Sequence, residues 1–494
     1  MHAGWKGGRI MTTMCTRGRE GWNRRDILRT AVGALAAIPA SRAASLGSQR
    51  SARPNILFVL TDDQRWDALG CAGNPVIRTP TIDRIARDGV RFERAFVTTP
   101  ICAASRASIL TGLYERTHGY TFEKPPLARG ATDLTYPALL RQSGYRTGFV
   151  GKLGVAVEKG AEREMFDVFQ PSSLPYFQDV GSERTYLTDL HASRAIEFIR
   201  AARPDHPFCL SVSFWAPHAD DDKPDQYFWP ASLDDLYRDV TIAPPPTSEP
   251  AFFESLPDFL KKTLNRERWY WRFDTPDKYQ RMVKGYYRMI TALDGAVGRI
   301  LDELDRLDLA RNTVVIFTSD NGYFLGDRGY ADKWTMHEPS IRVPFVVVDP
   351  RVPAEARGRV RDEMVLNVDI LPTVLELAGL PAPSGLPGAS LVPLVAGRRV
   401  PWRDEVFTEH LWDHPAIPRT EAVRTARFKY IRYPQHPEFE ELYDLEDDAW
   451  EAKNLAASEE HRARLAELRR HCDEWVRRLA ADPWSPAGPP TRPW

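Results

Sequence analysis

The sequence predicts an α/β fold in which a large, mostly parallel mixed sheet is sandwiched by helices. A smaller C-terminal α+β subdomain with a short antiparallel sheet follows it. Short, continuous apolar runs bounded by polar residues are typical of strands buried on both faces. Segments with helical periodicity separate these runs, as in proteins whose strands alternate with helices. A chain of 494 residues is also too long for one ordinary core, so a second, smaller domain is expected.

The apolar runs predict the strands of the large sheet. The two clearest runs, residues 55–60 and 313–318, end in Thr61-Asp62-Asp63 and Ser319-Asp320-Asn321. Further strands are predicted at 147–150, 208–214 and 345–348. The helices predicted between them lie at 82–88, 136–143, 187–202 and 279–307.

Residues 220–277 are rich in Pro, Asp and aromatic side chains and show little periodicity. We interpret them as an insertion over one rim of the sheet, because long loops of this kind usually carry function. The aromatic side chains in and just before the insertion could stack on sugar rings or simply pack it onto the core. They are Trp215, Tyr227, Phe228, Trp229, Trp269, Tyr270 and Trp271.

A Pro/Gly-rich stretch over 381–393 predicts the passage to the smaller subdomain. The large domain is therefore expected over 52–385 and the smaller one over 386–494. In the smaller one, residues 427–433 alternate like a strand and 442–445 predict a short one, whereas 459–479 predict an amphipathic helix.

The first 45 residues predict a twin-arginine-type export signal rather than part of the fold. Arg24 and Arg25 precede a short, mild apolar stretch over 30–40, with small residues and an expected cleavage near Ala43. The stretch is too short and too rich in Ala for a membrane span, so no stable membrane insertion is expected. The mature protein is expected to be exported, periplasmic or extracellular.

The charge balance excludes one class of partner. Lys and Arg number 66 against 67 Asp and Glu, a formal net charge of -1. No global basic field exists to recruit nucleic acid, so any anion recognition must be local. The cysteines that follow the signal are too few for a disulfide framework, although one bridge remains open. They are Cys71, Cys102, Cys209 and Cys472.

Four oxygen-bearing side chains follow the two clearest strands. In isolation, Asp62-Asp63 and Asp320-Asn321 would each be interpreted as a solvated turn. The carboxyl ends of parallel strands meet at one rim of a sheet, however, where ligands bind in such folds. Carboxylates gathered there repel one another unless a cation offsets them. The pattern therefore indicates a calcium or magnesium site.

Cys102 is followed at fixed spacing by Ser105 and Arg106, then by an apolar helical stretch ending in Thr111-Gly112. A lone cysteine is most often a small buried hydrophobe. The whole motif, however, resembles the signature of the type I, formylglycine-dependent sulfatases of the alkaline-phosphatase-like superfold. In that family the cysteine is oxidised to formylglycine, whose aldehyde hydrate attacks sulfate esters. The resemblance implies a formylglycine-generating or an anaerobic sulfatase-maturing enzyme as a partner.

The resemblance extends over most of the chain and implies roles for the site residues. Metal ligands are implied at Asp62, Asp63, Asp320 and Asn321, with the modified Cys102 completing the shell around one divalent cation, calcium or alternatively magnesium. Catalytic residues are implied at Cys102, Arg106, Lys152, His218 and Lys333. Arg106 would orient the hydrate and the metal ligands, the two lysines would stabilise the sulfate oxygens, and His218 or Lys333 would protonate the leaving oxygen.

The chain departs from the family at two positions. Ala104 stands where many members have proline, a variation also seen in the family. The family often carries a histidine two residues after the active-site lysine, and here that position is Gly154. Either another residue takes that role, with His118 and His337 as candidates, or Lys152 and a metal-bound oxygen suffice.

The function implied is hydrolysis of sulfate monoesters with release of inorganic sulfate. Sulfated glycans are the favoured substrates because of the aromatic insertion and the export signal, with choline sulfate and aryl sulfates as alternatives. One rival is a phosphatase, phosphodiesterase or phosphonate hydrolase of the same superfold, which would place Asp-His where this chain has Asp320-Asn321. The other is an inactive glycan-binding relative, against which the intact pair Cys102 and Arg106 argues.

Overall fold

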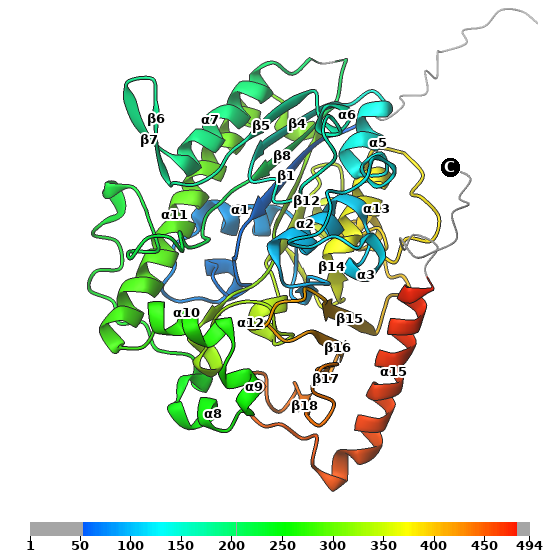
Figure 1. Cartoon of the computed structure of the whole chain (residues 1–494). Coiled ribbons are helices and arrows are strands. Elements are labelled where there is room, and N and C mark those ends of the chain that lie inside the picture. The colour runs from blue at the N-terminus through cyan, green and yellow to red at the C-terminus, as the bar shows by residue number, and fades with distance from the viewer. Residues whose placement is uncertain (1–52, 204, 482–494) are drawn as a thin grey trace, which may run out of the picture. The chain divides into compact units, whose positions relative to one another are not determined.

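A central eight-stranded sheet organises the protein, seen here in a computed structural model that describes residues 53–203 and 205–481 (Figure 1). The strand order is β13-β2-β12-β9-β1-β8-β4-β5. Five neighbouring strands run parallel to one another. They are β9 (Thr313–Ser319), β1 (Asn55–Thr61), β8 (Phe208–Ser213), β4 (Arg146–Gly151) and β5 (Val168–Pro171).

The remaining three strands make the sheet mixed. β12 (Phe345–Val348) runs antiparallel to both β9 and β2 (Val90–Phe92). β13 (Arg359–Arg361) then pairs with β2 in parallel. The predicted fold class, a mostly parallel mixed sheet, is confirmed. The reversal at β12 was not predicted, because an apolar run shows that a strand is buried but not which way it runs.

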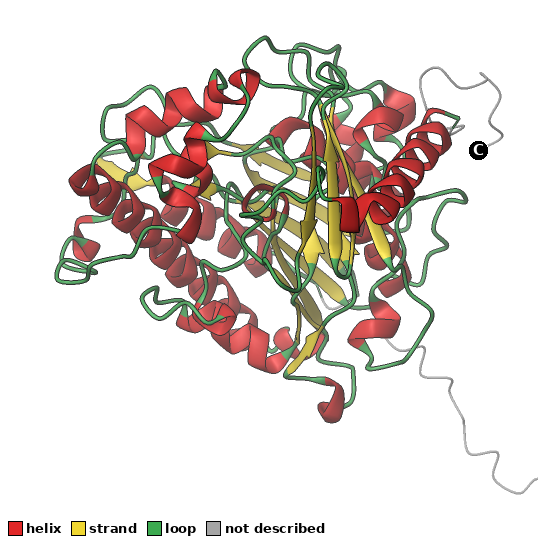
Figure 2. Ribbon diagram, turned by 90° about the horizontal axis from the view of Figure 1, so that it is seen from below, coloured by secondary structure: helices red, strands yellow, loops and turns green. Residues whose placement is uncertain are grey.

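Both faces of the sheet are covered by helices, as Figure 2 shows from below. Along β1 the side chains alternate: Ile56 and Phe58 enter one core cluster, whereas Leu57 and Val59 enter the other. This explains the continuous apolar run, since each face of the strand needs its own apolar set. The first cluster includes residues of α2 (Cys102–Thr111), α5 (Tyr136–Gln142) and α13 (Ile370–Leu377). The second includes residues of α1 (Pro80–Asp88), α7 (Leu187–Arg200) and α11 (Pro276–Arg306).

The C-terminal part contains the predicted antiparallel sheet, with four strands in the order β15-β16-β17-β18. Their bounds are Glu405–His410, Thr420–Thr425, Phe428–Arg432 and Glu440–Asp444, and α15 (Arg462–Ala480) follows. Phe407, Val423 and Leu468 belong to the same core cluster as α2. The described residues of this part and of the large sheet form one compact unit, so the division at 385/386 stays a prediction.

The insertion is more helical than its sequence indicates. It contains α8 (Pro250–Glu254), α9 (Asp258–Lys261) and α10 (Leu264–Arg272), and α11 begins at its end. Most of its aromatic side chains pack inward. Tyr227 is 2% exposed, whereas Tyr270 and Trp271 on α10 are 52% and 38% exposed.

The shorter elements connect these layers. The helices are α3 (Glu115–His118), α4 (Arg129–Thr132), α6 (Glu162–Met165), α12 (Glu338–Ile341) and α14 (Val392–Val395). The strands are β3 (Ala95–Phe96), β6 (Phe177–Val180), β7 (Glu183–Tyr186), β10 (Phe324–Leu325), β11 (Ala331–Asp332) and β14 (Val365–Leu366).

Two sequence predictions concern the export signal and the cysteines. The signal predicted over 1–45 lies outside the described residues. Within 53–203 and 205–481, no helix combines the length and the apolarity that crossing a membrane requires. Cys71, Cys102, Cys209 and Cys472 are all free thiols in this part of the chain.

Candidate active site

Three carboxylates meet where β1 and β9 end. Thr61 lies opposite Ser319 in the register of the two parallel strands, so Asp62 and Asp320 leave the sheet side by side. The amide of Asp320 donates to the carbonyl of Thr61 at 3.1 Å. The amide of Asp63, a residue in the left-handed region at φ 65°, donates to Asp320 Oδ1 at 3.2 Å. All three carboxylates are at most 1% exposed.

This cluster fits a hard cation. One oxygen from each of Asp62, Asp63 and Asp320 lies within 4.8 Å of the others. Asn321 donates through Nδ2 to Asp63 Oδ1 at 2.6 Å, while its buried Oδ1 has no protein partner. The buried amide oxygen accepts no hydrogen bond and lies beside three carboxylates. Oxygen ligands of these kinds are the ones that calcium and magnesium take.

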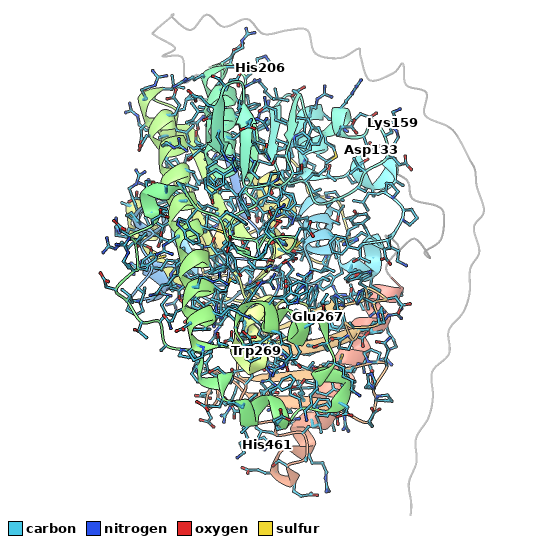
Figure 3. The ribbon with its side chains drawn as sticks, turned by 60° about the vertical axis from the view of Figure 1, so that its left-hand side comes forward. Asp133, Lys159, His206, Glu267, Trp269 and His461 are labelled. Carbon is cyan, nitrogen blue, oxygen red and sulfur yellow. The ribbon has the colours of Figure 1, made fainter. Side chains whose placement is uncertain are left out.

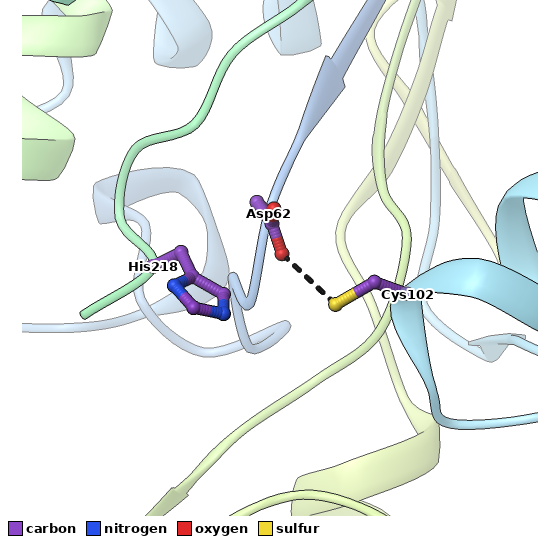
Figure 4. A group of neighbouring side chains, drawn as sticks. All are labelled: Asp62, Cys102 and His218. Atoms are coloured by element: carbon purple, nitrogen blue, oxygen red, sulfur yellow. Dashed lines mark hydrogen bonds between the residues drawn. The ribbon is translucent and has the colours of Figure 1, made fainter. Parts of the chain in front are cut away.

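Cys102 is the first residue of α2 and points into the same cluster. Its Sγ lies 3.4 Å from Asp62 Oδ1, and His218 lies on the other side of that carboxylate (Figure 4). Burial, together with the negative charge of Asp62, raises the pKa of the Cys102 thiol well above its usual value. An unmodified thiol here is a poor nucleophile, because the thiolate is the reactive form.

Arg106 lies one helical turn after Cys102, on the same face of α2. Its Nε donates to Asp320 Oδ2 at 2.7 Å. Its Nη1 donates to the carbonyl of Lys152 and to Ser213 Oγ, both at 2.6 Å. The guanidinium thus joins the ends of β9, β4 and β8, and it is 2% exposed. Ser213 was not predicted, although the strand-end rule that found Asp62 applies equally to the end of β8.

Two lysines pair with the carboxylates. Lys152, which follows β4, forms an ion pair with Asp62, and its ammonium lies 4.3 Å from the centre of the Trp215 ring. Lys333, which follows β11, forms an ion pair with Asp63. Both lysines are at most 9% exposed. They bring two positive charges to the rim where the carboxylates gather.

His218 lies on the segment that follows β8. Its Nδ1 lies 2.5 Å from the carbonyl of Ala219, which can only accept, so Nδ1 carries the proton. Its Nε2 lies 3.7 Å from Asp63 Oδ2. Burial lowers the pKa of His218, with Asp63 opposing the shift.

Positive side chains compensate the negative charges of the carboxylate cluster. Burial opposes ionisation of Asp62, but the positive charge of Lys152 and its neighbours outweighs burial and holds the pKa of Asp62 below its usual range. Burial raises the pKa of Asp320 to about 6, and the positive charge of Arg106 opposes that rise. In formal charge, the three carboxylates cancel Arg106 and the two lysines. A divalent cation would leave a net positive site suited to a monoanionic ester.

The sequence left open what replaces the histidine absent at Gly154. The backbone of Gly154 has φ +68°, and a Cβ there would lie 2.6 Å from Arg106 Cδ. Arg106 therefore occupies the space that a side chain at this position would need.

Neither of the two alternative histidines is free to replace it. His118 receives the amide of Tyr120 on Nδ1 at 3.0 Å and contacts Ser108 Oγ through Nε2 at 3.1 Å. His337 contacts Thr335 Oγ1 and Glu441 Oε2 at 3.0 and 3.2 Å. Both ring nitrogens of each histidine are thus engaged away from the carboxylate cluster. His218, by contrast, offers a ring nitrogen within 4.8 Å of Cys102 Sγ and of an oxygen of Asp62, so another residue and Lys152 both stay open for this role.

Comparisons with known proteins agree with this geometry. A family model described as sulfatase matches residues 54–380, and one described as N-sulphoglucosamine sulphohydrolase, C-terminal, matches residues 326–478. The chain is 29% identical to an N-acetylglucosamine-6-O-sulfatase of Bacteroides thetaiotaomicron, over 89% of each protein. It is also 29% identical to an arylsulfatase of Clostridium perfringens, over 85% of this chain and 93% of that one.

Two solved structures share the fold of this chain. A protein in complex with its substrate D-glucosamine-2-N,6-O-disulfate superimposes with a TM-score of 0.74 at 25% identity, covering 86% of this chain and 98% of that one. A phosphonate monoester hydrolase of Agrobacterium radiobacter gives a TM-score of 0.68 at 23% identity, over 90% of this chain and 100% of that one. The second likeness shows the shared fold alone.

Fold and site together define a hydrolase of the alkaline-phosphatase-like class. Within that class, the chain belongs to the sulfatase family, and it is a sulfuric ester hydrolase. The resemblance stated from the sequence is confirmed.

Proposed function

We propose that the protein removes sulfate from sulfated saccharides outside the cytoplasm, using a formylglycine made from Cys102. One observation carries the proposal: Cys102 begins α2 with its Sγ 3.4 Å from Asp62, inside the carboxylate cluster. Burial and Asp62 raise the pKa of this thiol, which disfavours the thiolate. The modified side chain would supply an aldehyde hydrate as the nucleophile in its place.

Asp62, Asp63, Asp320 and Asn321 would hold one divalent cation, with the modified Cys102 completing the set. Calcium is the expected ion and magnesium the alternative, because every ligand offers oxygen. When bound, it would supply positive charge that offsets the carboxylates and stabilises negative charge developing on the sulfate group.

Lys152 and Lys333 would bind the oxygens of the sulfate group, because their buried ammoniums reach the cluster from two sides. Arg106 would hold Asp320 and the ends of three strands in register. For the general acid, His218 and Lys333 are the two candidates. His218 could donate from Nε2 only when both ring nitrogens carry a proton, because Nδ1 keeps its proton on the carbonyl of Ala219.

The substrate class rests on relatives and on exposed aromatic side chains. An N-acetylglucosamine-6-O-sulfatase and an ulvan-active sulfatase of Formosa agariphila are among the proteins this chain resembles. Tyr270 and Trp271 on α10 remain exposed and could stack on sugar rings. The export signal predicted over 1–45 agrees with a polymeric substrate outside the cytoplasm.

The test combines mass and activity. Protein co-produced with a sulfatase-maturing enzyme should show a Cys102 peptide lighter by the exchange of sulfur for oxygen together with the loss of two hydrogens, because the thiol is oxidised to an aldehyde. Turnover should scale with the modified fraction. Cys102→Ala should fold and bind substrate without turnover. Full activity with an unmodified thiol would rule the mechanism out. A desulfation screen over defined sulfated saccharides, with an aryl sulfate and an aryl phosphate beside them, identifies the substrate and tests the phosphatase alternative.

A further inference from the structure

Lys333 lies on a segment with unusual backbone geometry. Its two neighbours, Asp332 and Trp334, have φ values of 73° and 85°, which are rare for residues other than glycine. The adjacent strands β10 and β11 have two residues each and offer little pairing. Such conformations persist only where the surroundings over-determine them. Other contacts must therefore hold Lys333 toward Asp63.

Asn265, on helix α10 of the insertion, supplies the first of these contacts. It is 0% exposed, and its Nδ2 donates to the carbonyls of Ala331 and Lys333 at 2.8 and 2.7 Å. These carbonyls flank Asp332, so one side chain holds the backbone on both sides of the left-handed residue. The amide of Trp334 donates to the carbonyl of Pro100, next to α2, at 3.2 Å.

Two arginines of α10 supply the second set of contacts. Arg268 Nη1 and Arg272 Nη1 donate to Asp332 Oδ2 at 2.6 and 3.0 Å. The same arginines reach Asp221: Arg268 Nη1 lies 2.8 Å from its Oδ2, and Arg272 forms an ion pair with it. Asp221 stands three residues after His218. One helix therefore joins the segment of Lys333 to the segment of His218.

The contacts are directed inward from a helix whose other side is open. Arg272 is 0% exposed, whereas Glu267 on the same helix is exposed. Glu267 and Trp269 mark α10 in Figure 3. Burying an arginine with its partners is weak evidence for stability, because desolvation offsets the attraction. The planar, multidentate guanidinium gives geometric specificity instead.

We propose that α10 is a positioning element: Asn265, Arg268 and Arg272 fix the segments of Lys333 and His218 relative to each other. The inference rests on the proposed function in that Lys333 binds the sulfate group. These three side chains do not touch the reacting atoms. They act through Lys333 and His218.

The first test is kinetic. Asn265→Asp removes the donating amide at constant size, and Arg272→Lys keeps the charge but loses the fork that spans two carboxylates. On an aryl sulfate, each should lower kcat about 10- to 100-fold with a smaller change in KM, as expected from misplacing a group by about 1 Å. Glu267→Gln, on the exposed side of α10, is the matched control and should match the wild type.

A second measurement separates positioning from a general loss of structure. In a Lys333→Ala background, Asn265→Asp should lower residual turnover by less than twofold, because a residue that acts through Lys333 has no effect once Lys333 is gone. The same fold-loss in both backgrounds would overturn the proposal. So would wild-type kcat for both single variants.

A readout independent of activity keeps this inference distinct from the proposed function. Hydrogen exchange of amides 331–336 should accelerate in Asn265→Asp, while exchange in β1 stays at the wild-type rate. Unchanged exchange at 331–336 would refute the positioning role whatever the enzyme cleaves. If the wild type cleaves no sulfate ester yet exchange changes as expected, the proposed substrate fails and the structural role of α10 stands.

Discussion

At the scale of single residues, Gly154 shows how one position constrains the site. Its φ of +68° is rarely adopted by residues with a side chain, and Arg106 Cδ would lie 2.6 Å from a Cβ placed there. Arg106 in turn donates hydrogen bonds to Asp320, Ser213 and the carbonyl of Lys152. The missing family histidine is thus tied to the close approach of Arg106.

We expect Gly154→Ala to lower kcat at least tenfold, because displacing Arg106 disturbs three strand ends at once. Gly181→Ala is the control: its φ is +65° but nothing lies within 4 Å of an added Cβ. Both variants should lose about 1 kcal/mol of stability from the left-handed backbone, whereas only Gly154→Ala should lose turnover. Equal turnover in the two would show that the contact with Arg106 does not matter. Thermal unfolding and steady-state kinetics provide the measurements.

At the scale of elements, the ends of β1 and β9 create the candidate metal site. Because the two strands are parallel neighbours in register, four oxygen-bearing side chains far apart in sequence meet at one rim. Each of Asp62 and Asp63 also has a lysine partner. Asp320 is paired with Arg106, so the formal charge of the three carboxylates is compensated even without an ion.

Removing the metal should abolish activity but leave the protein folded. Calcium in excess should raise the Tm, since an ion at 100 times its Kd stabilises by about 2.7 kcal/mol. Asp320→Asn should lose both the calcium-dependent rise in Tm and the turnover. The exposed Asp133→Asn should retain both. Two metals about 4 Å apart in the loaded protein would instead indicate two-metal phosphoryl-transfer chemistry.

Sequence reasoning succeeded where periodicity and burial coincide. The apolar runs at 55–60 and 345–348 correspond to β1 and β12, and the rule for strand ends brought Asp62 and Asp320 together. The sequence analysis did not predict α10, because the inward side of that helix has Asn265, Arg268 and Arg272 rather than an apolar stripe. Partners of this kind depend on long-range packing, which no local pattern encodes.

At the scale of the whole molecule, buried charges join the C-terminal sheet to the catalytic part. Lys429 of β17 is 0% exposed, and its Nζ lies 2.8 Å from Glu338 Oε1 and 2.6 Å from Glu451 Oε1. Glu338 begins α12, which follows the segment of Lys333. The sequence predicted the strand that carries Lys429 but not its partner, since alternation gives the face of a side chain and not what it meets. These ion pairs thus connect the small sheet to the helix that follows the segment of Lys333.

Glu115 forms another such junction and should make stability depend on pH. It lies on α3, is 2% exposed, and accepts the amide of Leu411, just beyond β15, at 3.1 Å. Burial, reinforced by the nearby charge of Glu409, raises its pKa from 4.5 to about 8. The folded protein therefore keeps a proton that the unfolded chain has already lost between these values. Where the folded state binds more protons, stability falls as pH rises.

We expect Glu115→Gln to remove this dependence, because the amide oxygen still accepts from Leu411 and cannot ionise. Between pH 5 and 8 the wild type should lose stability relative to the variant, by on the order of a few kcal/mol in total. The exposed Glu267→Gln should follow the wild-type curve. The measurement is the free energy of unfolding at a series of pH values, in protein with calcium held constant. If wild type and Glu115→Gln run parallel from pH 5 to 8, Glu115 ionises normally in the fold, and the junction it forms with the C-terminal sheet contributes no pH sensitivity.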